Sequence, residues 1–339
     1  MRPEAGEVNA DPPLVSVVTP IYNTAGYLRE CIESVLAQTC KRFEYVVVDN
    51  CSTDGSLEIA KHYASLDQRI RIHSNPEHLP AVDNFNRALG FISRGSRYTK
   101  IVFADDWLYP ECLERMIRVA DAAPSVGLVS SYSLAGDRVW GVGLPYGVSV
   151  FSGREVGRRQ LLGEGFYVGS CTTVLYRSDL VRSRPALFDR DSLHADTEFA
   201  YEILRSHDIG FVHQVLSYIR IDPDSTSGRI RDLSPLLLDE LIVLLKYGPD
   251  FLEPEELRRR RRQLERAYYR TYLTQMLGPN RSRFLEYHRP ALTRLGYRIS
   301  KRRMFGAALE ELADVLLNPK KTIARVRAGR RSRRDRVRG

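Results

Sequence analysis

The chain has 339 residues, 43% of them hydrophobic, which is enough to bury a substantial core in one large domain or two. Its net charge is +9, and the segment from Asn318 to Gly339 carries that excess alone, with ten Lys or Arg and one Asp. Five cysteines without CxxC spacing disfavour a metal–thiolate or disulfide framework and fit a reducing compartment. No apolar run approaches the roughly 18 residues of a membrane-spanning helix.

The N-terminal sequence MRPEAGEVNADPP has no apolar stretch of the kind found in secretory signals. Together with the lack of a spanning segment, this predicts a cytoplasmic protein, either soluble or peripheral on the inner face of the plasma membrane.

The first 135 residues alternate strand and helix patterns. Near-continuous apolar runs at Val15–Tyr22 and Tyr45–Asp49 are typical of parallel strands buried on both faces. Helical periodicity follows each of them, and the alternation continues through strand-like runs at 69–73, 100–104 and 126–132. Strands that alternate with helices predict an α/β fold with a mostly parallel sheet and right-handed crossovers.

The pattern changes after about residue 135. A Gly-rich stretch precedes Ser152-x-x-Glu155, which fits a capping box, and strand-like runs at 172–176 and 215–221 flank a helix near 196–205. Beyond Asp232 the sequence is helical and rich in Arg. We therefore predict these parts of the chain: a flexible N-terminus (1–13), an α/β domain (14–230, with halves 14–135 and 136–230), a helical region (231–317) and a basic disordered tail (318–339).

Three strand ends in the first half carry polar side chains. The first is TPIYN, which contains Pro20, Tyr22 and Asn23; the second is DNCSTDG, which contains Asp49, Asn50, Ser52 and Asp54; the third is the pair Asp105 and Asp106. Each alone has a structural explanation, such as a helix cap or a turn. Because ligands of open parallel sheets bind beyond the carboxyl ends of the strands, the three together predict a binding site.

Charge indicates what this site binds. Two adjacent carboxylates repel each other, and a divalent Mg²⁺ or Mn²⁺ ion bridging a diphosphate would relieve that repulsion. Such an ion would also neutralise a leaving nucleoside diphosphate. The sequence contains neither GxxxxGK[ST] nor a GxGxxG after the first strand, which disfavours an NTPase and a nicotinamide-dependent dehydrogenase.

The blocks VSVVTPIYNTAGYLRECIESVLAQT, FEYVVVDNCSTDGS and FADDWLYPECLERM closely resemble the family 2 glycosyltransferases over roughly residues 14–222. The resemblance implies a GT-A fold, a single nucleotide-diphospho-sugar-binding α/β domain. It implies that Pro20 and Tyr22 line the pocket for base and ribose, and that Asp49 hydrogen-bonds a uracil or thymine edge. It also implies that Asp106 ligates the metal while Asp105 contacts the sugar or ribose.

The chain departs from the commonest family pattern at two positions. Asn50 stands where many members have a second Asp, which affects the expected base more than the fold. Asp222 stands where members often have the His of an Arg-x-His sequence, so it is either a metal ligand or the start of the turn DPDS. Asn84 and Arg87 share one helix, whose polar side either faces the donor, as the resemblance implies, or is solvated.

An inverting glycosyltransferase needs a base that deprotonates the acceptor hydroxyl. In the family this acid opens a helix after the acceptor loop, and the matching stretch LHADTEFAYEILRS offers Asp196 first and Glu198 second. A purely structural role is open for Asp196, because helix dipoles favour acids at helix N-termini. The segment 163–177 would border the acceptor pocket.

The Arg-rich tail favours anionic lipid head groups, since no aromatic residue is interleaved with its arginines as a nucleic-acid surface would require. We therefore expect a metal-dependent glycosyltransferase. It would use UDP- or dTDP-sugar and a lipid-linked or glycan acceptor, such as a glycolipid or polysaccharide precursor of the cell envelope. Two alternatives stay open: a nucleotidyltransferase that makes sugar nucleotides, and a non-catalytic protein that binds membrane or nucleic acid through its tail.

Overall fold

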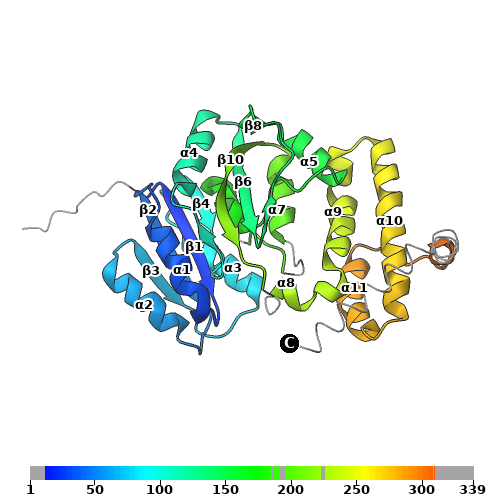
Figure 1. Cartoon of the computed structure of the whole chain (residues 1–339), viewed down its shortest axis with the longest axis horizontal. Coiled ribbons are helices and arrows are strands. Elements are labelled where there is room, and N and C mark those ends of the chain that lie inside the picture. Colours follow the sequence, from blue (N-terminus) through cyan, green and yellow to red (C-terminus); the bar gives the residue numbers. More distant parts are fainter. Residues whose placement is uncertain are drawn as a thin grey trace, which may run out of the picture. The chain divides into compact units, whose positions relative to one another are not determined.

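The computed structural model describes residues 12–184, 186–190, 192, 195–222, 226–307 and 309. The chain forms two compact units (Figure 1). Unit 1 comprises Met1–Ser225 with Asp250–Leu252, and unit 2 comprises Thr226–Pro249 with Glu253–Gly339. The predicted basic tail (318–339), most of the predicted flexible N-terminus and the turn residues 223–225 lie outside the described residues.

The strands of the described chain all belong to unit 1. They are β1 (Val15–Ile21), β2 (Phe43–Asp49), β3 (Ile70–Ser74), β4 (Tyr98–Ile101), β5 (Trp107–Leu108), β6 (Val126–Ala135), β7 (Arg138–Trp140), β8 (Val150–Phe151), β9 (Leu175–Arg177) and β10 (Asp208–Ile219). The α-helices that begin in this unit are α1 (Ala25–Leu36), α2 (Ser56–Leu66), α3 (Ala81–Leu89), α4 (Cys112–Ala122), α5 (Gly153–Leu161), α6 (Ser178–Arg182) and α7 (Ala195–Leu204).

The strands form one sheet in the order β3-β2-β1-β4-β9-β6-β10-β5, with β7 and β8 paired to β6 and β10. In the first half, β1 is parallel to both β2 and β4, and β2 is parallel to β3. In the second half, β9 is antiparallel to β4 and β6, whereas β6 and β10 are parallel. The predicted α/β class is confirmed, and the sheet, predicted to be mostly parallel, is mixed: four of its strand pairings are parallel and five are antiparallel.

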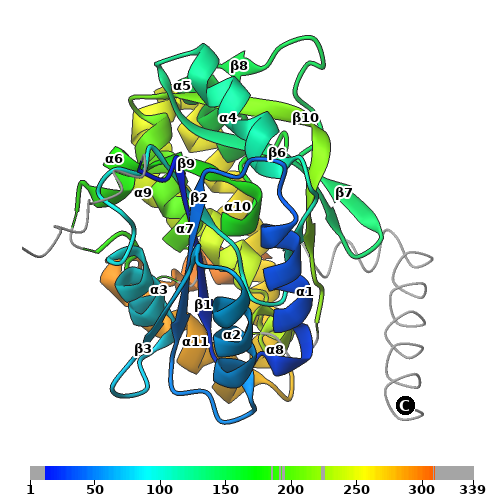
Figure 2. The same ribbon diagram turned by 90° about the vertical axis from the view of Figure 1, so that its left-hand side faces the viewer.

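Helices cover the first half of the sheet on both faces. Figure 2 shows β1 to β3 nearly edge-on, with α3 on one side and α1 and α2 on the other. All seven residues of β1 and of β2 are buried, as their continuous apolar runs predict. Helix α1 packs its apolar stripe of Leu28, Cys31, Ile32 and Val35 against this core.

The second half differs from its predicted strands in several details: β10 begins at Asp208 rather than near Val215, and the short strands β7 and β8 were not predicted. The predicted strand 172–176 begins with a 3₁₀ turn, η1 (Cys171–Thr173), and β9 starts only at Leu175. The turn closes through hydrogen bonds from the Thr173 and Val174 amides to the Ser170 and Cys171 carbonyls, which a straight strand does not form. The predicted helix cap is present, because the Ser152 hydroxyl accepts the Glu155 N–H at the start of α5.

The described chain beyond Ser225 is mostly helical, which agrees with the helical region predicted from residue 231. It contains α8 (Thr226–Arg229), the 3₁₀ turn η2 (Arg231–Leu233), α9 (Pro235–Phe251), α10 (Pro254–Met276) and α11 (Arg281–Arg294). Buried aromatic residues join α10 and α11: the Tyr268 hydroxyl lies 2.8 Å from His288 Nδ1, and the His288 ring stacks on Phe284. Among the helices of the described residues, none is long and apolar enough to cross a bilayer.

Candidate active site

The first two predicted strand ends meet at one edge of the sheet. Ile21, the last residue of β1, pairs with Asp49, the last residue of β2. Beyond them the two loops are bonded to each other: Asn23 Oδ1 accepts the Thr53 N–H at 2.8 Å, and Ser52 Oγ accepts the Asn23 N–H at 3.1 Å. Asn23 has φ 51°, a left-handed conformation that Asn tolerates better than most residues.

Asp54 ties the second loop to the start of α1. Its carboxylate accepts the Ala25 N–H at 2.9 Å and the Ser56 hydroxyl at 2.6 Å. These bonds hold the pKa of the Asp54 carboxyl below its ordinary value, against the opposing effect of burial. Asp49 is buried and accepts the Ser52 N–H. The second strand end is therefore a fixed loop rather than a mobile turn.

Asn50 and Asn84 lie beneath the surface of this edge. Asn75 Nδ2 donates to both, to Asn50 Oδ1 at 2.8 Å and to Asn84 Oδ1 at 2.9 Å. Asn50 also exchanges hydrogen bonds with the backbone of Leu79. Both asparagines are buried, so the solvated helix face considered for Asn84 is wrong for that residue, whereas Arg87 in the last turn of α3 is exposed. The hydrogen bonds of the asparagines shape the loop that follows β3.

That loop brings His78 to Tyr22. Tyr22 is 47% exposed although it directly follows a fully buried strand, and the ring centroids of Tyr22 and His78 are 4.5 Å apart. Pro20 lies within the buried part of β1. Sequence reasoning missed His78, because its spacing to other residues carries no pattern. Only the fold of the loop after β3 places an imidazole beside the predicted base-binding tyrosine.

The third strand end supplies Asp106, whose two carboxylate oxygens are both held. Oδ2 accepts the Thr172 hydroxyl at 2.6 Å, and Oδ1 accepts the Arg220 backbone N–H at 2.9 Å. The residue is 3% exposed. Burial, together with the nearby charge of Asp105, raises the pKa of Asp106 to about 7.

Arg220 is the cation at this strand end. Its Nε donates to the Asp105 carbonyl at 3.0 Å, its Nη2 forms an ion pair with Glu30, and its guanidinium lies 4.5 Å from the centroid of the Tyr27 ring. Asp222 accepts the Tyr27 hydroxyl at 2.8 Å, and this bond raises the pKa of Tyr27. The end of β10 is therefore bonded both to α1 and to the aspartate pair.

The residues at this edge fit a divalent cation that bridges a diphosphate. Asp106 is a buried carboxylate with no cationic side chain bonded to its oxygens, since the Arg220 guanidinium reaches the Asp105 carbonyl instead. Each Asp106 oxygen keeps a lone pair beyond the hydrogen bond that it accepts. Within the described residues no group of three or more His, Cys, Asp or Glu forms a closed metal site. Ions held by one or two carboxylates plus substrate phosphates need no such group.

The two candidate bases lie in the first turn of α7. Asp196 is half-buried and its Oδ1 accepts the Thr197 N–H at 2.8 Å, whereas Glu198 is buried. The charge of Asp196 helps to raise the pKa of the Cys171 thiol, although burial is the larger cause. Asp196 is therefore near Cys171, which directly precedes Thr172, the residue that binds Asp106. The structure also brings Thr172 to the site, which sequence reasoning did not predict.

Comparisons with known proteins address the family and the fold of the chain. The family model for glycosyl transferase family 2 matches residues 16–184. The chain is 34% identical over 122 residues to the putative teichuronic acid biosynthesis glycosyltransferase TuaG of Bacillus subtilis, a match that covers 36% of this chain and 48% of TuaG. The curated relatives compared are matched over 13% to 48% of their own lengths.

Two solved structures have the same fold at low identity. TarS 1–349 of S. aureus in complex with UDP gives a TM-score of 0.53 at 17% identity, covering 85% of this chain and 94% of that one. The mannosyltransferase PcManGT of Pyrobaculum calidifontis, in complex with GDP-Man and Mn²⁺, gives 0.54 at 19%, covering 96% and 88%. The predicted GT-A fold is confirmed. The match of the family model over residues 16–184, about half of the chain, identifies a family 2 glycosyltransferase domain in it.

Proposed function

We propose that this protein transfers a sugar from a nucleoside-diphosphate sugar to an acceptor hydroxyl, with inversion at the anomeric carbon and with the help of a divalent metal. One observation carries the proposal: the first two polar strand ends are hydrogen-bonded to each other, and the third follows β4, the parallel neighbour of β1, and carries the buried Asp106, which Thr172 and Arg220 hold. An edge of this kind is where open α/β sheets bind nucleotides.

The donor is a UDP- or dTDP-sugar. Tyr22 and His78 offer rings for the base, and Asp49 offers a buried carboxylate that accepts an N–H at a pyrimidine edge. The fold neighbours whose structures contain UDP or GDP-Man support a nucleotide diphosphate at this place. Between pyrimidine and guanine, the family resemblance favours a pyrimidine.

Asp106 would hold Mn²⁺ or Mg²⁺ together with the substrate diphosphate, and Asp222, which lies near Asp105, is the second candidate ligand. When bound, such an ion supplies Lewis-acid stabilisation of the leaving diphosphate. Arg220 keeps Asp106 in place through its amide and reaches the Asp105 backbone through its guanidinium. The neighbour that binds Mn²⁺ together with GDP-Man supports a divalent ion in this fold. Asp105 would contact the sugar or ribose.

Asp196 would act as the base, with Glu198 as the second candidate. Asp196 is half-buried in the first turn of α7, and a carboxylate in such a place can accept a proton from an acceptor hydroxyl. Glu198 is buried, which makes it less accessible to an acceptor.

The acceptor is a lipid-linked or glycan precursor at an anionic membrane surface. Residues 301–307 are helical, and the exposed Lys301 and Arg302 are followed by Phe305, which is 67% exposed, and Leu309, which is 51% exposed. Adjacent cations and apolar side chains suit binding in the head-group region of a bilayer. The ten cations of 318–339 follow in the sequence.

A panel of sugar nucleotides tests the proposal. The purified chain is incubated with each of them and with anionic membrane extract, in Mn²⁺, Mg²⁺ or chelator, and release of nucleoside diphosphate is measured. We expect release from one UDP- or dTDP-sugar, which chelator and Asp196→Asn both abolish. Release of pyrophosphate instead would identify a nucleotidyltransferase. If no nucleotide binds in calorimetry, the enzymatic proposal fails.

A further inference from the structure

A cavity lies at the opposite end of the strands from the aspartate pair. Its volume is about 480 Å³, within the range of small-molecule sites. It opens beside Tyr98, the first residue of β4, which pairs with Val15 at the start of β1. Its lining includes four arginines and two aspartates: Arg94, Arg97, Arg177, Arg182, Asp121 and Asp179.

The charges of this cavity do not cancel. Arg97 pairs with Asp121 at 2.6 Å, and Arg177 pairs with Asp179 at 2.5 Å. Arg182 bonds only to neutral oxygens, the Ser93 and Ser96 carbonyls and the Ser96 hydroxyl. Within the described part of the chain, the Arg94 side chain has no hydrogen bond or ion pair. Two guanidinium groups therefore lack an anion.

This positive excess is local. Unit 1 as a whole contains 23 Lys or Arg and 30 Asp or Glu, so its net charge is −7. A unit with net negative charge repels anions over most of its surface. The four arginines around this cavity give it the opposite local charge.

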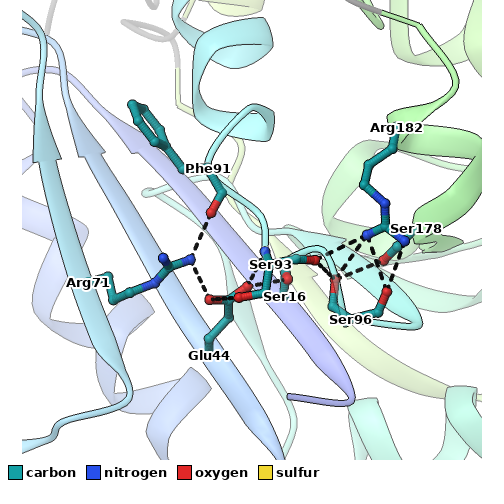
Figure 3. A network of polar contacts seen from close by, with 8 residues as sticks. All are labelled: Ser16, Glu44, Arg71, Phe91, Ser93, Ser96, Ser178 and Arg182. Atoms are coloured by element: carbon teal, nitrogen blue, oxygen red, sulfur yellow. Dashed lines mark hydrogen bonds and ion pairs between the residues drawn. The ribbon is translucent and has the colours of Figure 1, made fainter. Parts of the chain in front are cut away.

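The loop that carries Arg94 is held from both sides. On one side, the buried Glu44 accepts the Ser93 N–H at 2.6 Å, the Ser93 hydroxyl at 2.7 Å and the Ser16 hydroxyl at 2.5 Å, and it pairs with Arg71 (Figure 3). On the other side, Arg182 binds the Ser93 and Ser96 carbonyls. The backbone on either side of Arg94 is therefore fixed before any ligand arrives, which lowers the entropy lost on binding.

We propose that this cavity binds a phosphate-bearing small molecule, whose dianionic phosphate lies between Arg94 and Arg182. Guanidinium groups match phosphate oxygens with paired N–H donors, and the excess of two positive charges matches the charge of a phosphate monoester. The remaining volume accommodates the rest of the ligand. This site is separate from the proposed donor site, since the two lie at opposite ends of the strands.

The test is a titration of the full chain with inorganic phosphate and with glucose 6-phosphate as the monoester probe, followed by ³¹P NMR and calorimetry at low salt. Saturating UDP and Mg²⁺, a diamagnetic ion compatible with ³¹P NMR, are present throughout, so that the donor site is occupied. Arg94→Ala removes a side chain that holds no other part of the described chain, so the fold should be unchanged. Lys61→Ala on the exposed face of α2 is the matched control, because it removes the same charge away from the cavity.

We expect Arg94→Ala to weaken binding by about five- to tenfold and Arg94→Glu to abolish it, whereas Lys61→Ala leaves it unchanged. Tighter binding of the monoester than of inorganic phosphate would identify an organic ligand, and equal binding would identify the free ion. The proposal would be overturned if Arg94→Ala and Lys61→Ala weakened binding equally. It would also be overturned if the wild type bound no ligand at about 10 mM, on the order of the weakest useful affinity. The result does not depend on transferase activity, so it is separable from the proposed function.

Discussion

Asp106→Asn should stabilise the metal-free protein while it removes the proposed metal ligand. The unfolded carboxyl has its ordinary pKa near 3.8, whereas burial raises the pKa of the folded carboxyl to about 7. A raised folded pKa contributes stability that is complete below the unfolded value and is lost as the pH rises through the folded value. The wild type therefore loses stability between about pH 4 and pH 7.

The difference between those pKa values corresponds to about 4 kcal/mol. An asparagine avoids that cost but gives up the hydrogen bond that Asp106 accepts from Thr172, which subtracts about 1 kcal/mol. We expect Asp106→Asn to be more stable than the wild type by about 2 to 3 kcal/mol at pH 8 and to have no advantage at pH 4.5.

Urea unfolding followed by tryptophan fluorescence measures this difference. Both tryptophans of the chain, Trp107 and Trp140, lie in unit 1, so the signal reports that unit. Asp67→Asn is the matched control: a hydrogen bond with Arg69 lowers the pKa of Asp67, so this variant should lose stability above about pH 4. An Asp106→Asn variant with the same stability relative to wild type at both pH values would refute the reasoning.

Three further predictions follow from contacts at the site. Arg220→Ala removes the bonds to Asp105 and Glu30 but keeps the backbone amide, so kcat should fall by about tenfold or more with little change in UDP affinity; an unchanged kcat would contradict it. Tyr22→Ala and His78→Ala should each weaken UDP binding in calorimetry by about 1 kcal/mol, and equal affinity in all three proteins would place the base elsewhere. Deletion of 318–339 should abolish co-sedimentation with anionic vesicles and leave UDP binding intact.

The fold of the first half could be predicted because short segments of the sequence identify its strands and helices. Buried apolar runs such as 15–22 identify parallel strands, and the carboxyl ends of parallel strands necessarily share an edge. This is why Asn23, Asp54 and Asp106 can be grouped from the amino-acid sequence alone. The proposed roles of these residues remain predictions.

The partners of Asp106 could not be predicted. Thr172 is 66 positions and Arg220 is 114 positions away from it along the chain. Thr172 stands in no spacing that identifies it, and the Arg-x-Asp sequence that contains Arg220 does not indicate that its backbone amide binds Asp106. The 3₁₀ turn η1, which presents Thr172, reads as a strand in the sequence because threonine and valine favour strands. In the structure, these residues instead form the hydrogen bonds that close the turn.

The burial of the asparagines near the edge could not be predicted from the sequence, for a different reason. Asn84 lies on an amphipathic helix, and an asparagine in such a place is normally solvated. The structure buries it because Asn75 supplies its hydrogen-bonding partner from another segment and binds Asn50 in the same way. Hydrogen bonds between buried side chains of different segments cannot be recognised in a single sequence. The buried contacts of the candidate site therefore required the three-dimensional structure.

The most direct measurement of the donor site is a crystal structure of the chain with UDP and Mn²⁺, with the metal located by its anomalous signal. The proposal predicts the Mn²⁺ peak between Asp106 and the diphosphate, with the base beside Tyr22 and near the Asp49 carboxylate. A nucleotide bound away from the edge formed by β1, β2 and β4, or a metal that does not touch the aspartate pair, would contradict it.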